Sequence, residues 1–230
     1  MVTRRGTVWG VALAAWALAA GPLEAQRPDL SEFDYENLSF RGIGIDVGFL
    51  APNRVESAFS VGGRVDLGYL GPSFRIVPHA SYWSSDFKTG EVRELEDQVQ
   101  ALIEQELPAG TPAPTVNLGS ITWSDLAVGL DGHFVWAIPS LGVLSLAGVG
   151  ATAHFLNGSG AAIEGTFVED LLDSWTVGLN AHGGLEVPMS ERMRVYGIAR
   201  YNLLEDLRAF EFRLGAQVMF GEPLPGERTR

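Results

Sequence analysis

Apolar and polar residues alternate with a period of two along most of the chain after Phe40. In the segment 42–49, the odd-numbered positions carry only isoleucine, valine and phenylalanine, and the even-numbered positions carry three glycines and Asp46. Successive side chains of a strand point to opposite faces, so this pattern predicts a strand with one apolar and one polar face. Seven further segments alternate in the same way: 59–70, 74–84, 121–136, 142–156, 175–187, 194–201 and 208–220.

The connections between these segments alternate between short and long. Tight turns are expected at 71–73, 137–140 and 188–191, and longer loops at 50–58, 85–119, 157–174 and 202–208. Outer-membrane barrels have short turns on the periplasmic side and longer loops on the outside. The expected fold is therefore all-β: an eight-stranded antiparallel transmembrane β-barrel with short periplasmic turns and long extracellular loops.

An uncharged stretch at 134–153 has the length of a membrane-spanning helix. Pro139 lies within this stretch and glycine recurs at positions 142, 148 and 150, so two apolar strands joined by a tight turn explain it better. In the second of these strands, we expect Thr152 to face inward. The residues expected to face outward there are Val143, Ala147, Val149 and Phe155.

Aromatic residues stand at or near the strand ends on the apolar faces. Rings at both rims of an apolar surface form the girdles that mark the two lipid–water interfaces. In a lipocalin, which is a soluble eight-stranded barrel, the apolar face would instead line the interior. The predicted girdle consists of Phe49, Tyr69, Phe74, Tyr82, Trp136, Phe155, Trp175, Tyr201, Phe210 and Phe220.

The polar faces would then line the lumen with arginines and a nearly equal number of carboxylates. Buried charges are costly unless they are paired and hydrogen-bonded, so this balance predicts an ion-pair network that fills the barrel. Eight strands leave an interior only about wide enough for side chains, but a narrow channel for small solutes or ions is the alternative. The predicted network consists of Asp46, Arg64, Asp66, Arg75, Asp125, Asp131, Glu186, Arg194, Arg200, Glu211 and Arg213.

The first 25 residues have the features of a secretory signal peptide, with Arg4 and Arg5 before an apolar run and Ala25 at the expected cleavage site. We expect a signal peptide at 1–25, a periplasmic segment at 26–39, the barrel at 40–220 and a tail at 221–230. The net charge of −12, the single lysine and the lack of cysteine argue against nucleic-acid binding and exclude disulfides and thiolate chemistry. No cofactor is expected.

Histidines on the polar faces raise two chemical possibilities. His79 and Ser81 have the spacing of the His-x-Ser pair of a barrel-type lipid A deacylase. Both should point into the lumen, and no partner acid is evident, so we favour a packing role and expect no enzymatic activity. His133, His154 and His182 could form a metal site with the aspartates, but they lie on three strands at unknown relative heights. We favour ordinary hydrogen bonding and expect no metal site.

The loop 85–119 carries apolar residues at helical spacing in 90–107, which predicts a helix of about four turns. With two basic and seven acidic residues, this loop has a net charge of −5. The loop 157–174 adds acidic residues and a short amphipathic turn. A solvated acidic rim whose apolar residues pack over the barrel mouth is favoured; the alternative is a surface that binds divalent cations, lipopolysaccharide-bound ions or a basic partner.

Pro78 conflicts with its place inside the third predicted strand. Proline has no N–H and cannot donate a hydrogen bond to a neighbouring strand. We therefore expect a local bulge or a displaced register beside Pro78.

The chain resembles the small OmpA/OmpX-type outer-membrane barrels over residues 40–220. The resemblance rests on three segments, GIGIDVGFL, FSVGGRVDLGYL and the closing LGAQVMF. Phe220 at the end of the last segment is similar to the terminal aromatic residue that the barrel-assembly machinery recognises. In this chain, however, GEPLPGERTR follows Phe220. The resemblance implies an outer-membrane location, with outer-membrane lipid and lipopolysaccharide as partners. It also implies a structural, anchoring or surface-interaction role, with a porin-like channel or a lipid-modifying hydrolase as alternatives.

Overall fold

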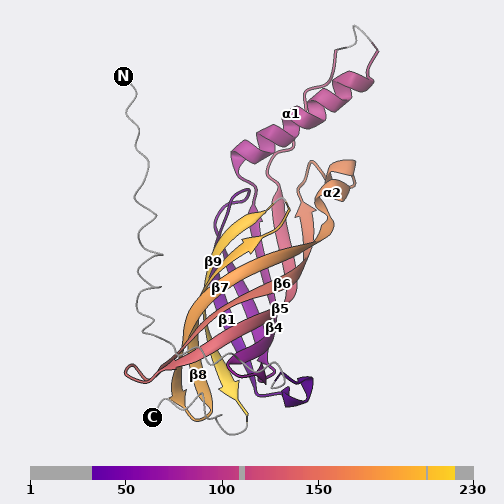
Figure 1. Cartoon of the computed structure of the whole chain (residues 1–230). Helices are drawn as coiled ribbons and strands as arrows, with labels where there is room; N and C mark the ends of the chain where they lie inside the picture. The colour runs from indigo at the N-terminus through magenta and orange to yellow at the C-terminus, as the bar shows by residue number, and fades with distance from the viewer. Residues whose placement is uncertain (1–32, 109–111, 206, 221–230) are drawn as a thin grey trace, which may run out of the picture. The chain divides into compact units, whose positions relative to one another are not determined.

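The computed structural model describes residues 33–108, 112–205 and 207–220. The expected signal peptide at 1–25 and the tail at 221–230 lie outside these ranges, as do residues 26–32 of the expected periplasmic segment 26–39. Within the described part of the chain, the structure is an antiparallel sheet closed into a barrel (Figure 1).

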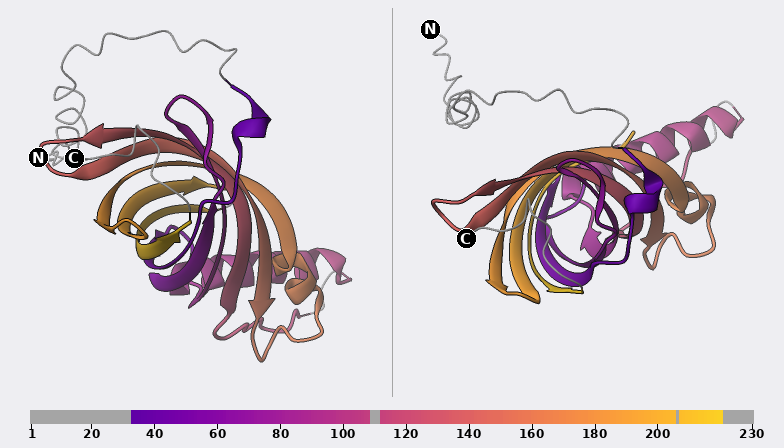
Figure 2. Two further views of the ribbon diagram at one scale, coloured as in Figure 1. Left: turned by 90° about the horizontal axis from the view of Figure 1, so that it is seen from below. Right: turned by 60° about the horizontal axis from the view of Figure 1, so that its bottom comes forward.

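Nine strands form the sheet in the order β2-β1-β9-β8-β7-β6-β5-β4-β3, and pairing between β2 and β4 closes it. Strands β2 and β3 are the two parts of one interrupted strand. Counted in this way, the barrel has the eight strands that the alternation predicts. Figure 2 shows the strands curving around a common axis. The strands are β1 (Gly42–Pro52), β2 (Ala58–Asp66), β3 (Tyr69–Gly71), β4 (Phe74–Asp86), β5 (Thr122–Ile138), β6 (Val143–Ser159), β7 (Ser174–Ser190), β8 (Met193–Leu203) and β9 (Arg208–Met219).

Tight turns join the strands at one end of the barrel, which we call the turn end. They lie between β3 and β4, between β5 and β6 and between β7 and β8, as predicted. In the first, Ser73 has a φ of 61°, and in the second, Gly142 has a φ of 65°, the left-handed conformation that closes such turns. The longer connections lie at the opposite end, the loop end.

Two helices lie in the loops, α1 (Thr89–Glu106) and α2 (Phe167–Leu172), and a short 3-10 helix, η2 (Tyr35–Asn37), precedes β1. The bounds of α1 differ by one residue from the predicted 90–107. Its apolar residues recur every three or four positions, and Val92 and Val99 are buried. In the described residues, no helix combines the length and apolar character needed to cross a membrane.

The barrel is apolar outside and polar inside. On β1, for example, Ile45 and Val47 are 73 % and 60 % exposed, whereas Asp46 between them is buried. The two faces of β6 also follow the expectation, with Val149 and Phe155 exposed and Thr152 buried. A small apolar cluster interrupts the polar interior: Val135, Leu144, Leu146, Tyr196 and Ile198.

A β-bulge divides β2 from β3 and corrects the prediction for Tyr69. Leu67 donates a backbone hydrogen bond to Ile76, and Ile76 donates one to Gly68, so two residues oppose one. Gly68, with a φ of 76°, accommodates the bulge. The extra residue shifts the register by one and reverses the faces beyond it. Tyr69 therefore pairs with the buried Arg75 and packs against the inner cluster instead of facing outward.

Pro78 lies close to this shift. The β2–β4 pairing runs from Ser60↔Trp83 to Arg64↔His79 and stops one residue before Pro78, while its pairing with β5 continues. Ile76 directs its N–H toward β2 and β3, so the nitrogen of Pro78, two residues later, faces the same side. The pairing of β4 with β2 is therefore interrupted at Pro78, which has no hydrogen to donate, and the register shift expected beside it lies two residues away, at Ile76.

Buried apolar residues from the loops and from the loop ends of the strands form a cluster that we call the loop cap. It contains side chains of α1 and α2, and Trp123 also donates a hydrogen bond to the carbonyl of Leu172 at 3.2 Å. Half-buried residues of both helices pack against it. The loop cap consists of Leu50, Val55, Trp83, Phe87, Val92, Val99, Leu118, Ile121, Trp123, Leu156, Ile163, Val168, Leu204, Leu207 and Ala209.

Candidate functional site

The polar lumen is the candidate functional site, because it gathers most of the buried charge of the described chain. All eleven residues of the predicted network are buried there, none more than 8 % exposed. They come from seven strands, and each points inward because it shares the inner parity of its strand. The structure divides them into four groups of contacts.

The first group surrounds Glu186 on β7. Its carboxylate accepts hydrogen bonds from Arg64 at 2.7 Å and from Arg75 at 2.5 and 3.0 Å, and Arg194 lies 3.6 Å away. Arg75 also donates to Asp66 at 3.2 Å. Three arginines thus converge on one fully buried glutamate, which makes Glu186 the most heavily shared anion of the lumen.

The second group joins β1, β8 and β9. Arg213 lies 2.9 Å from the carboxylate of Asp46 and 3.5 Å from that of Glu211. The hydroxyl of Tyr196 donates to Asp46 at 2.7 Å, and the guanidinium of Arg64 lies over the Tyr196 ring, 3.4 Å from its centroid. Tyr196 therefore links the first two groups through a hydrogen bond and a cation–π contact.

The third group surrounds Asp131 on β5. Arg200 donates a short hydrogen bond to Oδ2 of Asp131 and another, 3.0 Å long, to Nε2 of His79. His133 and His182 also lie near this carboxylate, with ring nitrogens 3.9 and 4.0 Å from its oxygens. Asp131 thus lies among three of the four histidines of the chain.

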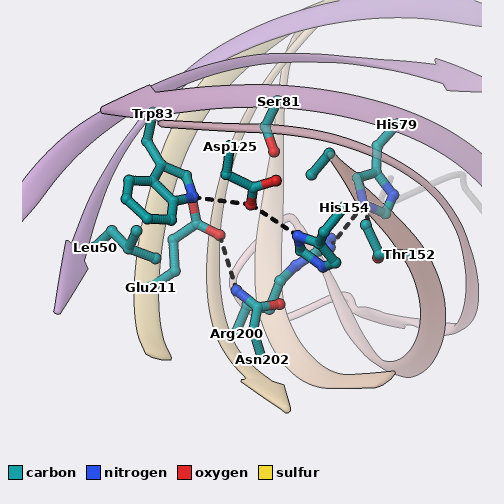
Figure 3. A pocket seen from close by; sticks show the side chains of 11 residues that line it. Leu50, His79, Ser81, Trp83, Asp125, Thr152, His154, Arg200, Asn202 and Glu211 are labelled. Atoms are coloured by element: carbon teal, nitrogen blue, oxygen red, sulfur yellow. Dashed lines mark hydrogen bonds and ion pairs between the residues drawn. The ribbon is translucent and has the colours of Figure 1, made fainter. Parts of the chain in front are cut away.

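The fourth group lies nearer the loop end and lines a small cavity (Figure 3). Asp125 accepts hydrogen bonds from Trp83 at 3.0 Å and from Nδ1 of His154 at 2.7 Å. The structure therefore separates His154 from His133 and His182, although sequence reasoning placed the three histidines in one candidate set.

Ser81 lines this cavity but does not complete a Ser-His-Asp triad. Ser81 pairs with Ala127, which pairs with His154, so the three lie in one row across β4, β5 and β6. The Nε2 of His154 lies beside Gly178 on β7, on the side away from β4. A general base must reach the hydroxyl that it deprotonates, and this nitrogen points elsewhere.

Glycines on the inner face make room for the network. A Cβ at Gly62 would lie 2.1 Å from Arg213, and one at Gly150 would lie 2.0 Å from Asp131. Sequence reasoning recorded these glycines only as part of the polar face. Asn180 and Gln217 were expected on the polar face but not in the charge network, and Ser60 and Tyr196 were missed, although their parity would have placed them inside.

The aromatic residues of the predicted girdle lie at both ends of the barrel, apart from Tyr69. Strand direction places Trp136 and Phe220 at the turn end, exposed, with the half-buried Phe74. Phe220 stacks on Phe40, with ring centroids 5.2 Å apart. The exposed rings at the loop end are Phe49, Tyr82, Phe155, Trp175, Tyr201 and Phe210.

Several acidic residues of the loops hold other parts of the loops in place. Glu91 pairs with Arg54 at 2.9 Å, and Glu96 accepts a hydrogen bond from the backbone N–H of Leu118 at 2.9 Å. Asp173 accepts hydrogen bonds from Gly158 and Asn157 at 2.8 and 3.1 Å. These carboxylates therefore connect α1 and the 160–173 loop to neighbouring chain.

Comparison with known proteins identifies the fold. No protein-family model matches the sequence, and no curated protein matches it. Among solved structures, the chain is similar to Neisserial surface protein A, with a TM-score of 0.50, 13 % identity, and coverage of 80 % of this chain and 99 % of that one.

Two other barrels give lower scores. The N-terminal β-barrel domain of Pseudomonas aeruginosa OprF matches with a TM-score of 0.44 and 10 % identity over 80 % of this chain and 99 % of that one. Ail, the attachment invasion locus protein of Yersinia pestis, matches with a TM-score of 0.41 and 12 % identity over 79 % and 99 % of the two chains. The likeness to Neisserial surface protein A concerns the fold alone, which is that of a small eight-stranded barrel.

Proposed function

We propose that the protein is an outer-membrane β-barrel with a structural, anchoring or surface-interaction role, and that its lumen is closed. The observation that carries the proposal is the inverted distribution of side chains, with apolar residues outside and paired charges inside. In water, a continuous apolar belt around a barrel would be an aggregation surface. In a bilayer, the same belt meets lipid, and the aromatic rings at both ends meet the two interfaces.

The closed lumen is supported by the contacts that cross it. Arg64 on β2 reaches Glu186 on β7, and Ser60 on β2 donates to Glu211 on β9 at 2.7 Å. The loop cap lies beyond the charged groups at the loop end. A narrow channel would need a continuous path of water through both regions.

Planar-bilayer recording tests the closed lumen. The full chain is refolded in detergent and inserted, and heat-modifiable migration on a gel shows that each preparation is folded. We expect no steady unitary conductance. Discrete and reproducible conductance steps would favour the narrow channel and contradict the proposal.

The loop end is proposed to face the outside of the cell and the turn end the periplasm, since outer-membrane barrels have this arrangement. The chain has no cysteine, so single cysteines can report the side directly. With a membrane-impermeant maleimide on intact cells, Glu104→Cys on α1 should be labelled, and Ser140→Cys in the β5–β6 turn should be labelled only after permeabilisation. The unchanged chain serves as the control. The reverse pattern would overturn the orientation.

The acidic loops are proposed to form a solvated rim that packs over the barrel mouth, and outer-membrane lipid and lipopolysaccharide are proposed as partners of the barrel. The alternative is that the loops bind divalent cations, lipopolysaccharide-bound ions or a basic partner. The roles of Glu91, Glu96 and Asp173 within the loops support a rim that is mainly structural. Calcium calorimetry on the folded barrel tests the alternative. Heat of binding at millimolar calcium, lost on deletion of 90–107, would favour cation binding.

We also propose that the protein is not a hydrolase, since Nε2 of His154 lies on the side away from Ser81, and His79 contacts Arg200 and Asp131 through its two ring nitrogens. We expect both the unchanged barrel and the Ser81→Ala variant to release acyl chains from lipid A only at the background rate. Acyl release by the unchanged barrel that Ser81→Ala abolishes would refute this proposal.

A further inference from the structure

We propose that the lumen binds one divalent first-row transition metal ion through Asp131, His133 and His182. Each of these residues offers one ligand atom, and the three atoms lie within 4.8 Å of one another. Two imidazoles and one carboxylate are a ligand set that Zn²⁺ and its neighbours in the first row bind. This site goes beyond the proposed structural role and does not depend on it.

The register of three strands brings the ligands together. His133 on β5 pairs with Gly148 on β6, and Gly148 pairs with His182 on β7, so the two histidines lie in one row on either side of a glycine. In the next inward-facing row, Asp131 and Asn180 flank Gly150 in the same way. Figure 1 shows β5 and β6 as adjacent ribbons, and β7 is the next strand of the sheet after β6.

The two glycines of β6 leave the space that the ligands occupy. A Cβ at Gly148 would lie 2.5 Å from Nε2 of His182, and a Cβ at Gly150 would lie 2.0 Å from Oδ1 of Asp131. Both distances are shorter than real Cβ contacts, so any other residue at either position would displace a ligand. Side chains from β5 and β7 can meet over β6 only because β6 has no side chains there.

Two ring nitrogens in this space lack hydrogen-bond partners. Nε2 of His133 and Nε2 of His182 are both buried and unpartnered, and the two rings have centroids 4.8 Å apart. The side chain of His182 has no exposed surface, and that of His133 is 1 % exposed. Burying such a nitrogen without a partner costs free energy, and a bound metal ion would remove that cost.

Neighbouring groups leave one lone pair of His182 and one of Asp131 available to a metal ion. Nδ1 of His182 lies 2.7 Å from Oδ1 of Asn180, so this nitrogen carries the ring proton and Nε2 keeps its lone pair. Arg200 binds Oδ2 of Asp131, and Nδ1 of His79 lies 3.3 Å from the same oxygen. Oδ1 accepts one hydrogen bond, from Asn180 at 3.2 Å, and retains a lone pair for the metal.

His133 must change one hydrogen bond to bind. Its Nδ1 lies 3.2 Å from Nη2 of Arg75, which makes Nδ1 the acceptor and puts the proton on Nε2. Metal binding at Nε2 moves that proton to Nδ1, and Arg75 keeps its contacts with Asp66 and Glu186. Ligand atoms at about 2.0–2.1 Å from Zn²⁺ are about 3.4 Å apart, so the side chains also rotate inward.

Metal retention by the folded chain tests the site. The full chain is refolded in detergent with Zn²⁺ present, because the lumen is buried and folding is the step at which an ion can enter. Unbound zinc is removed on a desalting column, and bound zinc is measured by mass spectrometry. We expect about one zinc per chain, and His182→Gln should lower the retained zinc by about tenfold or more.

His154→Gln is the matched control, because His154 is also buried in the lumen but pairs with Asp125, outside the site. It should retain as much zinc as the unchanged chain. Refolding with Co²⁺ gives a second readout that needs no variant: coordination by nitrogen and oxygen should produce visible d–d absorption. Failure of the unchanged chain to hold zinc and to develop this absorption would overturn the proposal, as would full retention by folded His182→Gln.

Discussion

The lumen and the loop cap fill the same barrel in different ways. In the lumen, charged side chains of strands far apart in sequence meet in defined pairs, as Arg64 does with Glu186, 122 residues later. In the loop cap, apolar side chains from the loops and the loop ends of the strands pack together without such directional partners. Ion pairs require each partner in one place, whereas apolar packing depends mainly on volume.

This difference predicts different sensitivities to substitution. Loss of one member of a buried ion-pair group leaves its partners charged and desolvated. Loss of one apolar side chain from the cap leaves a cavity that neighbours can partly fill. The following substitutions test that contrast, measured as the free energy of unfolding in urea after insertion into lipid vesicles.

Glu186→Gln should have the largest effect. It removes the carboxylate shared by Arg64 and Arg75, with Arg194 nearby, and leaves buried positive charge without compensation. The expected loss is about 3–5 kcal/mol. Glu164→Gln, an exposed residue of the 160–173 loop, is the control and should leave stability unchanged. Equal effects of the two substitutions would contradict the account of the lumen.

Ile163→Ala should have the next largest effect. Ile163 has no exposed surface and belongs to the loop cap, so truncation creates a cavity costing about 2–3 kcal/mol. The matched control is Leu171→Ala, because Leu171 is 65 % exposed in the same loop. A loss for Ile163→Ala as small as that of its control would mean that the cap contributes little to stability.

Tyr196→Phe examines a single directional bond of the lumen. It removes the hydroxyl that donates to Asp46 at 2.7 Å but keeps the ring beneath Arg64. The expected loss is about 1–2 kcal/mol, because one oxygen of the buried Asp46 carboxylate loses its hydrogen-bond donor. Tyr82→Phe on the outer face provides the comparison. If both phenylalanine variants unfold at the same urea concentration, the Tyr196 hydroxyl has no stabilising role.

Glu91→Gln should have the smallest effect. The pair between Glu91 and Arg54 connects α1 with the β1–β2 loop, but both side chains are about one-third exposed. Solvent screens such a pair, so the expected loss is about 0–1 kcal/mol and should shrink further at high salt. A loss comparable to that of Glu186→Gln would show that the loop end also depends on specific ion pairs.

Much of the fold could be predicted because it depends on local pattern. Alternation within each strand is sufficient to assign faces, so it predicts the interior position of all eleven lumen charges without any knowledge of their partners. The spacing of Val92 and Val99 similarly predicted α1 to within one residue. The prediction that Tyr69 faces outward was wrong, because a single bulge at Leu67 and Gly68 reverses the parity beyond it. Alternation in the sequence cannot reveal such an extra residue.

The contacts across the barrel could not be predicted in this way. Which residues meet depends on the heights of strands relative to one another, and register is a property of pairs of strands. His133 and His182 share a row only because Gly148 lies between them, whereas His154 lies in another row with Asp125 nearby. The sequence by itself determines the strands, their two faces and the loop helix, because these depend on residues close in sequence. The tertiary structure alone decides which charges pair, which loops form the cap and which three side chains meet over β6, because these depend on register and closure.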